Sequence, residues 1–149
     1  MNITYSGMLR EPSVIEETFS KMPSPDVVSK LEAIILDGPQ VDLETCHLIH
    51  EGVCSRTVFI KAGTVVTGAK TNIPNICVVS GDITATTDEG LKRFTGYHVL
   101  KANAGFKRAV LAHSDTYWTT IWKSELTDIC ELEDEMTDES SMLQTRRDG

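Results

Sequence analysis

The feature that most constrains this chain is a series of short apolar segments between residues 56 and 122. Each segment is rich in Val, Ile and Thr, and residues such as Gly, Asn and Asp separate one segment from the next. β-branched residues favour extended backbone and the small polar residues favour tight turns, so a repeat of about ten residues is typical of short strands joined by turns. The pattern predicts an all-β domain whose antiparallel strands close on themselves as a sandwich or barrel.

The same pattern sets the expected strand boundaries. Two apolar segments flank Glu51-Gly52, which predicts a hairpin with its turn at these residues. In this prediction Gly81-Asp82 separates two strands, and Gly96 begins another. The strands expected after the hairpin are residues 65–67, 76–80, 83–87, 96–100, 107–112 and 116–122.

A helix is expected before these strands. Ser24-Pro25-Asp26 combines an N-cap residue, a proline at the first helical position and an acid in the first turn. The apolar residues that follow fall on one face at helical spacing, and Gly38-Pro39 ends the pattern. We therefore predict an amphipathic helix over Pro25–Asp37.

The composition changes again at Glu125. The segment that follows is acidic, with Ile129, Leu132 and Met136 at helical spacing, so a short helix and a mobile tail both remain open. We divide the chain into an N-terminal arm and helix (1–39), a β-barrel (40–124) and an acidic C-terminal tail (125–149).

Composition excludes several classes of protein. The chain has 149 residues, 40% of them hydrophobic, which is enough for one domain with a core of its own. A formal net charge of −8 argues against nucleic-acid binding, which needs clustered Lys and Arg. We find neither a secretory signal pattern nor an apolar run of about 18 residues, so we expect no membrane partner. The four cysteines form no CxxC pair, and we expect free thiols in a reducing cytoplasm.

Several blocks of the barrel segment resemble the cupin superfamily, the RmlC-like jelly roll. They are Ala62-Gly63-Thr64 with Thr67-Gly68, residues 78–83 with 87–90, residues 104–108, and residues 115–121. Within that superfamily the chain is most similar to small cupin-like proteins of tailed phages and prophages. The resemblance implies a double-stranded β-helix (cupin jelly roll) with a cavity between its sheets, which here carries an N-terminal helix and an acidic C-terminal extension. It also implies a homo-oligomer, since cupins commonly form dimers or larger assemblies.

The resemblance also indicates where a metal would be bound. Cupins typically hold one divalent metal with two or three His and a Glu inside the barrel. Here Thr71 and Asn75 stand where the phage relatives usually have His, and Arg108 stands where the second motif has its ligand His. Thr is not a usual ligand for these metals, and Arg stays protonated. We therefore expect no metal and no other cofactor.

The histidines leave two enzymatic alternatives open. Some sugar epimerases of this fold use a His–Asp pair as general base and a Tyr as acid, and here His50 or His98 with Tyr97 or Tyr117 is the candidate set. Alternatively, His47, His50 and His98 form a relocated metal site. The first alternative needs either His50 or His98 to face the cavity, and the second needs both. Each describes an enzyme acting on a sugar or another small molecule.

A basic spot is a further candidate site. Lys70, Lys107 and Arg108 are expected at the cavity mouth, where they would bind a carboxylate or a phosphate. The alternative is that they pair with carboxylates across the rim of the barrel, namely Asp82, Asp88 or Asp115.

The favoured hypothesis is a non-enzymatic structural or interaction protein of the cupin fold. The framework of the fold is retained while the usual ligand residues are replaced, and the extensions at both ends suit contacts between chains. This hypothesis describes a phage-encoded homo-oligomer in the host cell cytoplasm or the virion, with phage structural proteins as partners.

Overall fold

The computed structural model describes residues 5–6, 25–37 and 43–143. The predictions for the rest of the N-terminal arm, for the Gly38-Pro39 helix stop and for the last six residues lie outside the described residues. Neither helix of the described chain is long and apolar enough to cross a membrane.

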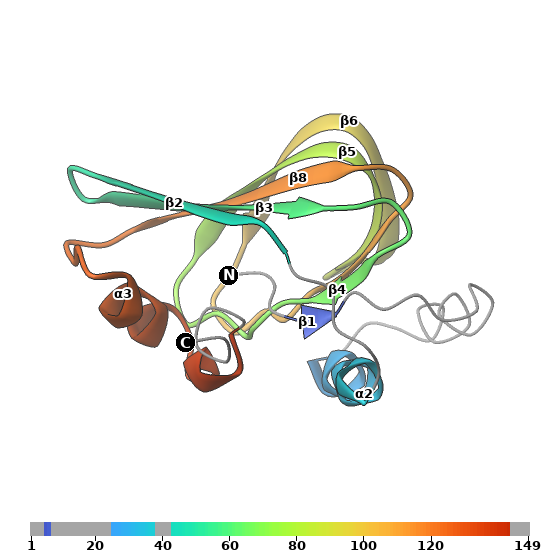
Figure 1. Ribbon diagram of the computed structural model, residues 1–149, viewed down its shortest axis with the longest axis horizontal. Coiled ribbons are helices and arrows are strands. Elements are labelled where there is room, and N and C mark those ends of the chain that lie inside the picture. The colour runs from blue at the N-terminus through green and yellow to red at the C-terminus, as the bar shows by residue number, and fades with distance from the viewer. Residues whose placement is uncertain (1–4, 7–24, 38–42, 144–149) are drawn as a thin grey trace.

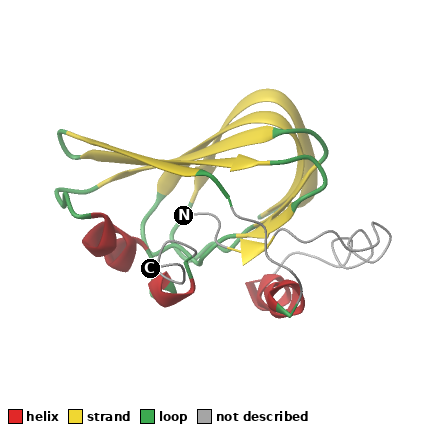
Figure 2. Ribbon diagram, viewed as in Figure 1, coloured by secondary structure: helices red, strands yellow, loops and turns green. Residues whose placement is uncertain are grey.

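The strands form one curled antiparallel sheet (Figures 1 and 2). Its order is β1-β4-β7-β5-β8-β3-β2, and β6 pairs with β5 outside this path. The strands are β1 (Tyr5–Ser6), β2 (Thr45–His50), β3 (Val53–Ile60), β4 (Val65–Thr67), β5 (Asn75–Thr87), β6 (Gly90–Ala102), β7 (Ala109–Ala112) and β8 (Thr116–Lys123). The β2–β3 hairpin turns at Glu51 (φ 47°) and Gly52 (φ 80°), as the sequence predicts.

Within the described residues, two helices and a 3₁₀ turn lie on the side of the sheet opposite the curl of β5 and β6 (Figure 1). Helix α2 spans Pro25–Leu36 and packs beside β1 and β4. Helix α3 spans Ile129–Met136, and the 3₁₀ helix η1 spans Ser140–Met142. The sequence left a short helix and a mobile tail open for the acidic segment, and the described part of that segment contains a short helix. Asp128 caps α3, since its Oδ2 accepts a hydrogen bond of 3.0 Å from the Glu131 N–H.

The β5–β6 hairpin corrects one of our strand predictions. Gly81 and Gly96 do not end strands: they lie opposite each other in the ladder, and both 13-residue strands continue through them. A Cβ at Gly81 would lie 2.8 Å from the Thr116 Cα, and Gly81 has a φ of 155°. Glycine at this position therefore lets β5 pass close to the backbone of β8, where a larger residue would collide.

The core lies on the inner face of the curled sheet. Alternate residues of β3 and β8 are buried, among them Val58, Ile60 and Trp118. A second cluster lies beneath α3, where Trp122 packs with Leu132, Met136, Leu143 and Cys54. Burial of each large apolar side chain stabilises the fold by roughly 1.5–3 kcal/mol.

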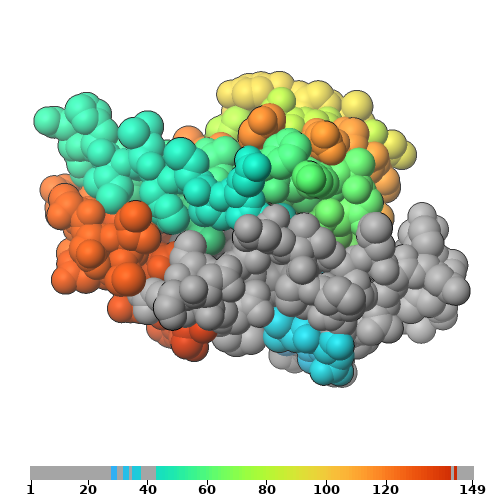
Figure 3. Space-filling model, viewed as in Figure 1, coloured from blue at the N-terminus to red at the C-terminus, as the bar shows by residue number. Residues whose placement is uncertain are grey.

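Buried ion pairs attach the helical segments to the sheet. Arg56 Nη1 on β3 lies 3.1 Å from Glu133 Oε2 on α3, and both side chains are almost fully buried. Lys107 Nζ lies 3.1 Å from Glu32 Oε2 on α2 and 3.0 Å from Glu139 Oε1 in the C-terminal segment. Figure 3 shows the C-terminal residues, in orange, lying against the teal residues of the β2–β3 hairpin.

Candidate functional site: the Arg108 cavity

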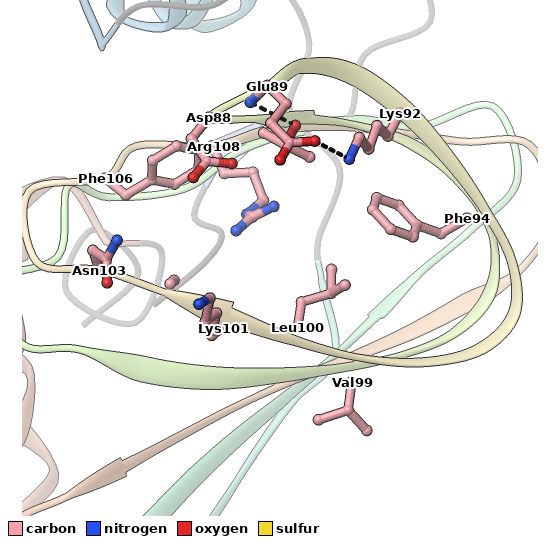
Figure 4. A pocket seen from close by; sticks show the side chains of 12 residues that line it. Asp88, Glu89, Lys92, Phe94, Val99, Leu100, Lys101, Asn103, Phe106 and Arg108 are labelled. Atoms are coloured by element: carbon pink, nitrogen blue, oxygen red, sulfur yellow. Dashed lines mark hydrogen bonds and ion pairs between the residues drawn. The ribbon is translucent and has the colours of Figure 1, made fainter.

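A cavity of about 450 Å³ opens between the β5–β6 hairpin and the loop that precedes β7 (Figure 4). Asp88, Glu89 and Lys92 lie along one edge, where the hairpin turns. The remaining wall is mixed: Phe94, Leu100 and Phe106 supply apolar surface, and polar side chains such as Asn103 and Arg108 lie between them. This volume lies within the range of small-molecule sites in proteins, roughly 300–1,000 Å³.

Arg108 is the buried cation of this cavity. The residue is only 7% exposed, and Figure 4 shows its guanidinium projecting into the space between the walls. Its Cζ lies 4.7 Å from the ring centroid of Phe106 and 5.4 Å from that of Trp118. Two aromatic faces therefore hold the guanidinium plane through cation–π contacts.

One hydrogen bond orients the Arg108 guanidinium. Arg108 Nη1 donates to the Thr86 carbonyl oxygen at 3.0 Å. No carboxylate of the described residues lies within the 4.0 Å of an ion pair with Arg108. Burial lowers the pKa of Arg108 from its usual value, while Cys77 and Asp88 act in the opposite direction. The cavity thus contains a desolvated cation whose partners, among described residues, are a carbonyl and aromatic rings.

The three residues of the predicted basic spot do not meet at this cavity. Lys107 is buried on the other side of the chain between Glu32 and Glu139. Lys70 is exposed, and its backbone N–H donates to Glu139 Oε1 at 2.6 Å. Successive residues of an extended segment point to opposite sides, which separates Lys107 from Arg108.

The rim carboxylates named as alternative partners take different roles. Asp82 forms an ion pair of 2.7 Å with Arg93, and Asp115 Oδ1 accepts a hydrogen bond from the Ala62 N–H at 3.0 Å. Asp88 lines the cavity, and its charge acts on Arg108.

Solved structures similar to this chain share its architecture. Ectoine synthase from P. lautus is 19% identical, with a TM-score of 0.50, over 62% of this chain and 71% of that one. A cupin superfamily protein from Desulfitobacterium hafniense DCB-2 is 14% identical, with a TM-score of 0.49, over 62% of this chain and 87% of that one. Over the matched part, the chain therefore shares the fold of the ectoine synthase structure. No protein-family model matches the chain, and no curated protein matches it. At these identities the likeness extends to the fold alone.

The positions that the resemblance assigns to a metal do not fit one here. Arg108 places a positive charge at the ligand position of the second motif. The Asn75 side chain is occupied by its neighbours, because its Nδ2 donates to the Ile73 carbonyl at 3.1 Å and its Oδ1 accepts from Cys77 Sγ at 3.3 Å. Thr71 is 4% exposed and offers a single hydroxyl. These residues lack the imidazoles and carboxylates that divalent metals prefer in cupins.

The structure does not bring the candidate catalytic residues together around the cavity. Tyr97 and Tyr117 are 69% and 56% exposed and point away from the core, as does His50 on β2. His98 lies opposite Val79 on the inner face, where its Nε2 pairs with the Thr95 carbonyl at 2.9 Å. None of the four is among the residues that line the cavity.

The relocated metal site is a prediction that the structure corrects. His47 and His50 are three residues apart on β2, so their side chains lie on opposite faces of the sheet, and His98 belongs to a distant strand. Within residues 5–6, 25–37 and 43–143, no group of three or more His, Cys, Asp or Glu side chains is suited to a metal. Burial and the nearby Arg56 lower the pKa of His47, which favours its neutral form.

Sequence reasoning did not find the aromatic rings around Arg108. Phe106 lies two residues before Arg108 and therefore on the same side of an extended chain, a signal that the sequence does contain. Trp118 comes from β8, and only the sheet topology brings it to the same place.

Proposed function

We propose that this chain is a non-enzymatic interaction protein of the cupin fold, which works as a homo-oligomer through the outer face of its sheet. The outer sheet face is the side of β2, β3, β8, β5 and β6 that points away from the core. Strand register and alternation assign to it Cys46, Leu48, His50, Val53, Ser55, Thr57, Phe59, Ile76, Val78, Ser80, Tyr97, Val99, Lys101, Tyr117, Thr119, Ile121 and Lys123.

The observation that carries the proposal is the apolar character of this face. Seven large hydrophobic residues of the described chain are exposed, and six of them lie here. They are Leu48, Val53, Ile76, Tyr97, Val99 and Tyr117, each about half exposed or more. Contiguous exposed apolar surface of this kind usually marks a contact with another protein.

The charge distribution favours a second copy of the chain as the partner. The whole chain has a net charge of −8, yet the residues assigned above include no Asp or Glu and only two lysines, Lys101 and Lys123. Farther along β5 and β6 the same face carries one carboxylate, Asp82, whose charge is paired with Arg93. Two copies that meet through this face avoid the repulsion between their acidic surfaces. Tyr97 and Tyr117 supply the large aromatic area that is enriched in such interfaces.

The proposal includes that the chain is encoded by a phage, because its barrel segment resembles the small cupin-like proteins of tailed phages and prophages. In this setting the oligomer assembles in the host cell cytoplasm, and phage structural proteins are its further partners. The replacement of the cupin metal ligands by Thr71, Asn75 and Arg108 supports a role in binding rather than in metal-dependent catalysis.

Native mass spectrometry with light scattering at micromolar concentration tests this proposal. We expect an oligomer for the natural chain and a monomer for Tyr97→Glu and Val99→Glu, because each places a charge in the contact. Both residues are exposed in the single chain, so these variants are expected to fold. Ile129→Glu is the matched control, since Ile129 is 40% exposed but lies on α3. A monomeric natural chain, or oligomers that survive both substitutions, would contradict the proposal.

A further inference from the structure

We propose that the Arg108 cavity is a binding site for a small organic carboxylate with an apolar body. This inference goes beyond the proposed interaction role and does not depend on the oligomeric state. It rests on a buried cation that is aimed into a formed cavity and meets no carboxylate of the described residues.

The donors of Arg108 suit a planar anion. A guanidinium has five N–H donors in a fixed plane, and the structure assigns one of them to the Thr86 carbonyl. Phe106 and Trp118 hold the plane, so the remaining donors are oriented before any ligand arrives. A carboxylate can accept two parallel hydrogen bonds from two N–H groups of one guanidinium. Each charge is then neutralised by the other in a site that is shielded from water.

The walls of the cavity select the rest of the ligand. Phe94, Leu100 and Phe106 present apolar surface next to the guanidinium, so an aliphatic or aromatic body would be buried there (Figure 4). Burial of that body would supply binding free energy that a free inorganic ion cannot gain.

The charges at the rim favour a monoanion over a phosphate dianion. Asp88 and Glu89 are the carboxylates that line the cavity, and each would repel a second negative charge. The cations there are Lys92 and Lys101, and Lys92 is already paired with Glu89. Arg108 thus provides one buried positive charge for one negative charge, which matches a carboxylate.

Titration of the full chain with sodium benzoate tests the inference, with benzamide as the neutral analogue of the same shape. Binding is followed by calorimetry and by the NMR signals of the arginine Nε–H groups. We expect benzoate to bind at least about tenfold more tightly than benzamide and to shift one arginine signal. Arg108→Gln, whose amide can still donate to the Thr86 carbonyl, is expected to weaken benzoate binding at least about tenfold. Arg93→Gln, which removes an exposed arginine, is expected to change it less than about twofold.

A second variant keeps the test decisive if Arg108→Gln does not fold. Asp88→Asn removes the carboxylate whose charge acts on Arg108, and it lies in an exposed turn. We expect it to tighten benzoate binding at least about twofold, because it removes a repulsive charge. Equal binding of benzoate and benzamide, tighter binding of inorganic phosphate than of benzoate, or an unchanged affinity in Asp88→Asn would each overturn the inference.

Discussion

Lys107→Met provides the sharpest test of how the helical segments are attached to the sheet. Lys107 Nζ lies 3.1 Å from Glu32 Oε2 and 3.0 Å from Glu139 Oε1, and the lysine side chain is only 2% exposed. Met keeps most of the volume of the side chain and removes its charge. Glu139 is 27% exposed and can recover water, whereas the Glu32 side chain, at 5%, would remain a buried carboxylate without its cation.

The expected loss follows from that uncompensated charge. Removal of one partner from a buried ion pair costs about 3–5 kcal/mol of unfolding free energy. For a chain of this size, each kcal/mol lowers the melting temperature by roughly 2–4 °C, so we expect a decrease of about 10 °C. Thermal and urea unfolding at pH 7, followed by circular dichroism, would measure it.

The pH dependence identifies Glu32 as the cause. Burial raises the pKa of Glu32 above its usual value even with Lys107 present, and loss of Lys107 would raise it further. A carboxyl whose pKa is higher in the folded than in the unfolded state destabilises the fold increasingly as pH rises from about 4.5 through the folded pKa. The penalty of Lys107→Met should therefore be large at pH 7 and smaller at pH 4.

Two further results decide whether this reasoning is correct. Lys92→Met is the matched control, because it breaks the exposed Lys92–Glu89 pair and is expected to leave the unfolding midpoint nearly unchanged. Glu32→Gln combined with Lys107→Met should recover part of the lost stability. A loss below about 1 kcal/mol at pH 7, or the same loss at both pH values, would refute the argument.

Two other predictions concern the sheet. Gly81→Ala is expected to cost at least about 3 kcal/mol of unfolding free energy, because its Cβ would collide with Thr116, whereas Gly96→Ala, with no atom within 4 Å, should cost about 1 kcal/mol from its positive φ alone. Urea unfolding of the two variants compares them, and equal losses would contradict the collision. His47 has a lowered pKa in the folded state, so its contribution to stability is present above pH 6.5 and is lost as pH falls towards the folded pKa. His47→Gln should therefore flatten the decrease of unfolding free energy between pH 7 and pH 5, and an unchanged slope would show that other groups cause it.

The sequence predicted the local structure well where one residue type decides the backbone. Apolar segments rich in Val, Ile and Thr marked β3 and β8, and Glu51-Gly52 marked the hairpin turn. It failed at Gly81 and Gly96, since a glycine inside a strand looks the same in sequence as a glycine in a turn. Only the pairing of the two strands, which brings Gly81 opposite Gly96, distinguishes the cases.

The candidate site was predicted less well because its geometry is tertiary. Adjacent basic residues suggested that Lys107 and Arg108 act together, but the extended backbone directs them to different surroundings. The partners of Lys107 are Glu32 and Glu139, which lie 75 and 32 residues away in the chain. Similarly, the histidines are close in sequence on β2, and strand alternation places them on opposite faces. The apolar outer face of the sheet becomes visible only when five strands are aligned in register.

The pairing of β3 with β8 has a consequence for synthesis on the ribosome. Arg56 on β3 is synthesised before its ion-pair partner Glu133, which lies 77 residues later in the chain. At ordinary elongation rates, Glu133 emerges from the ribosome about 4–15 s after Arg56. During most of that interval the inner face of β3 has neither β8 beside it nor α3 beneath it. A chain that stops before α3 would leave Trp122 uncovered and Arg56 without its carboxylate. Helix α3 therefore completes the packing of the sheet, and a product terminated before it would expose apolar strands instead of folding into a smaller version of the same protein.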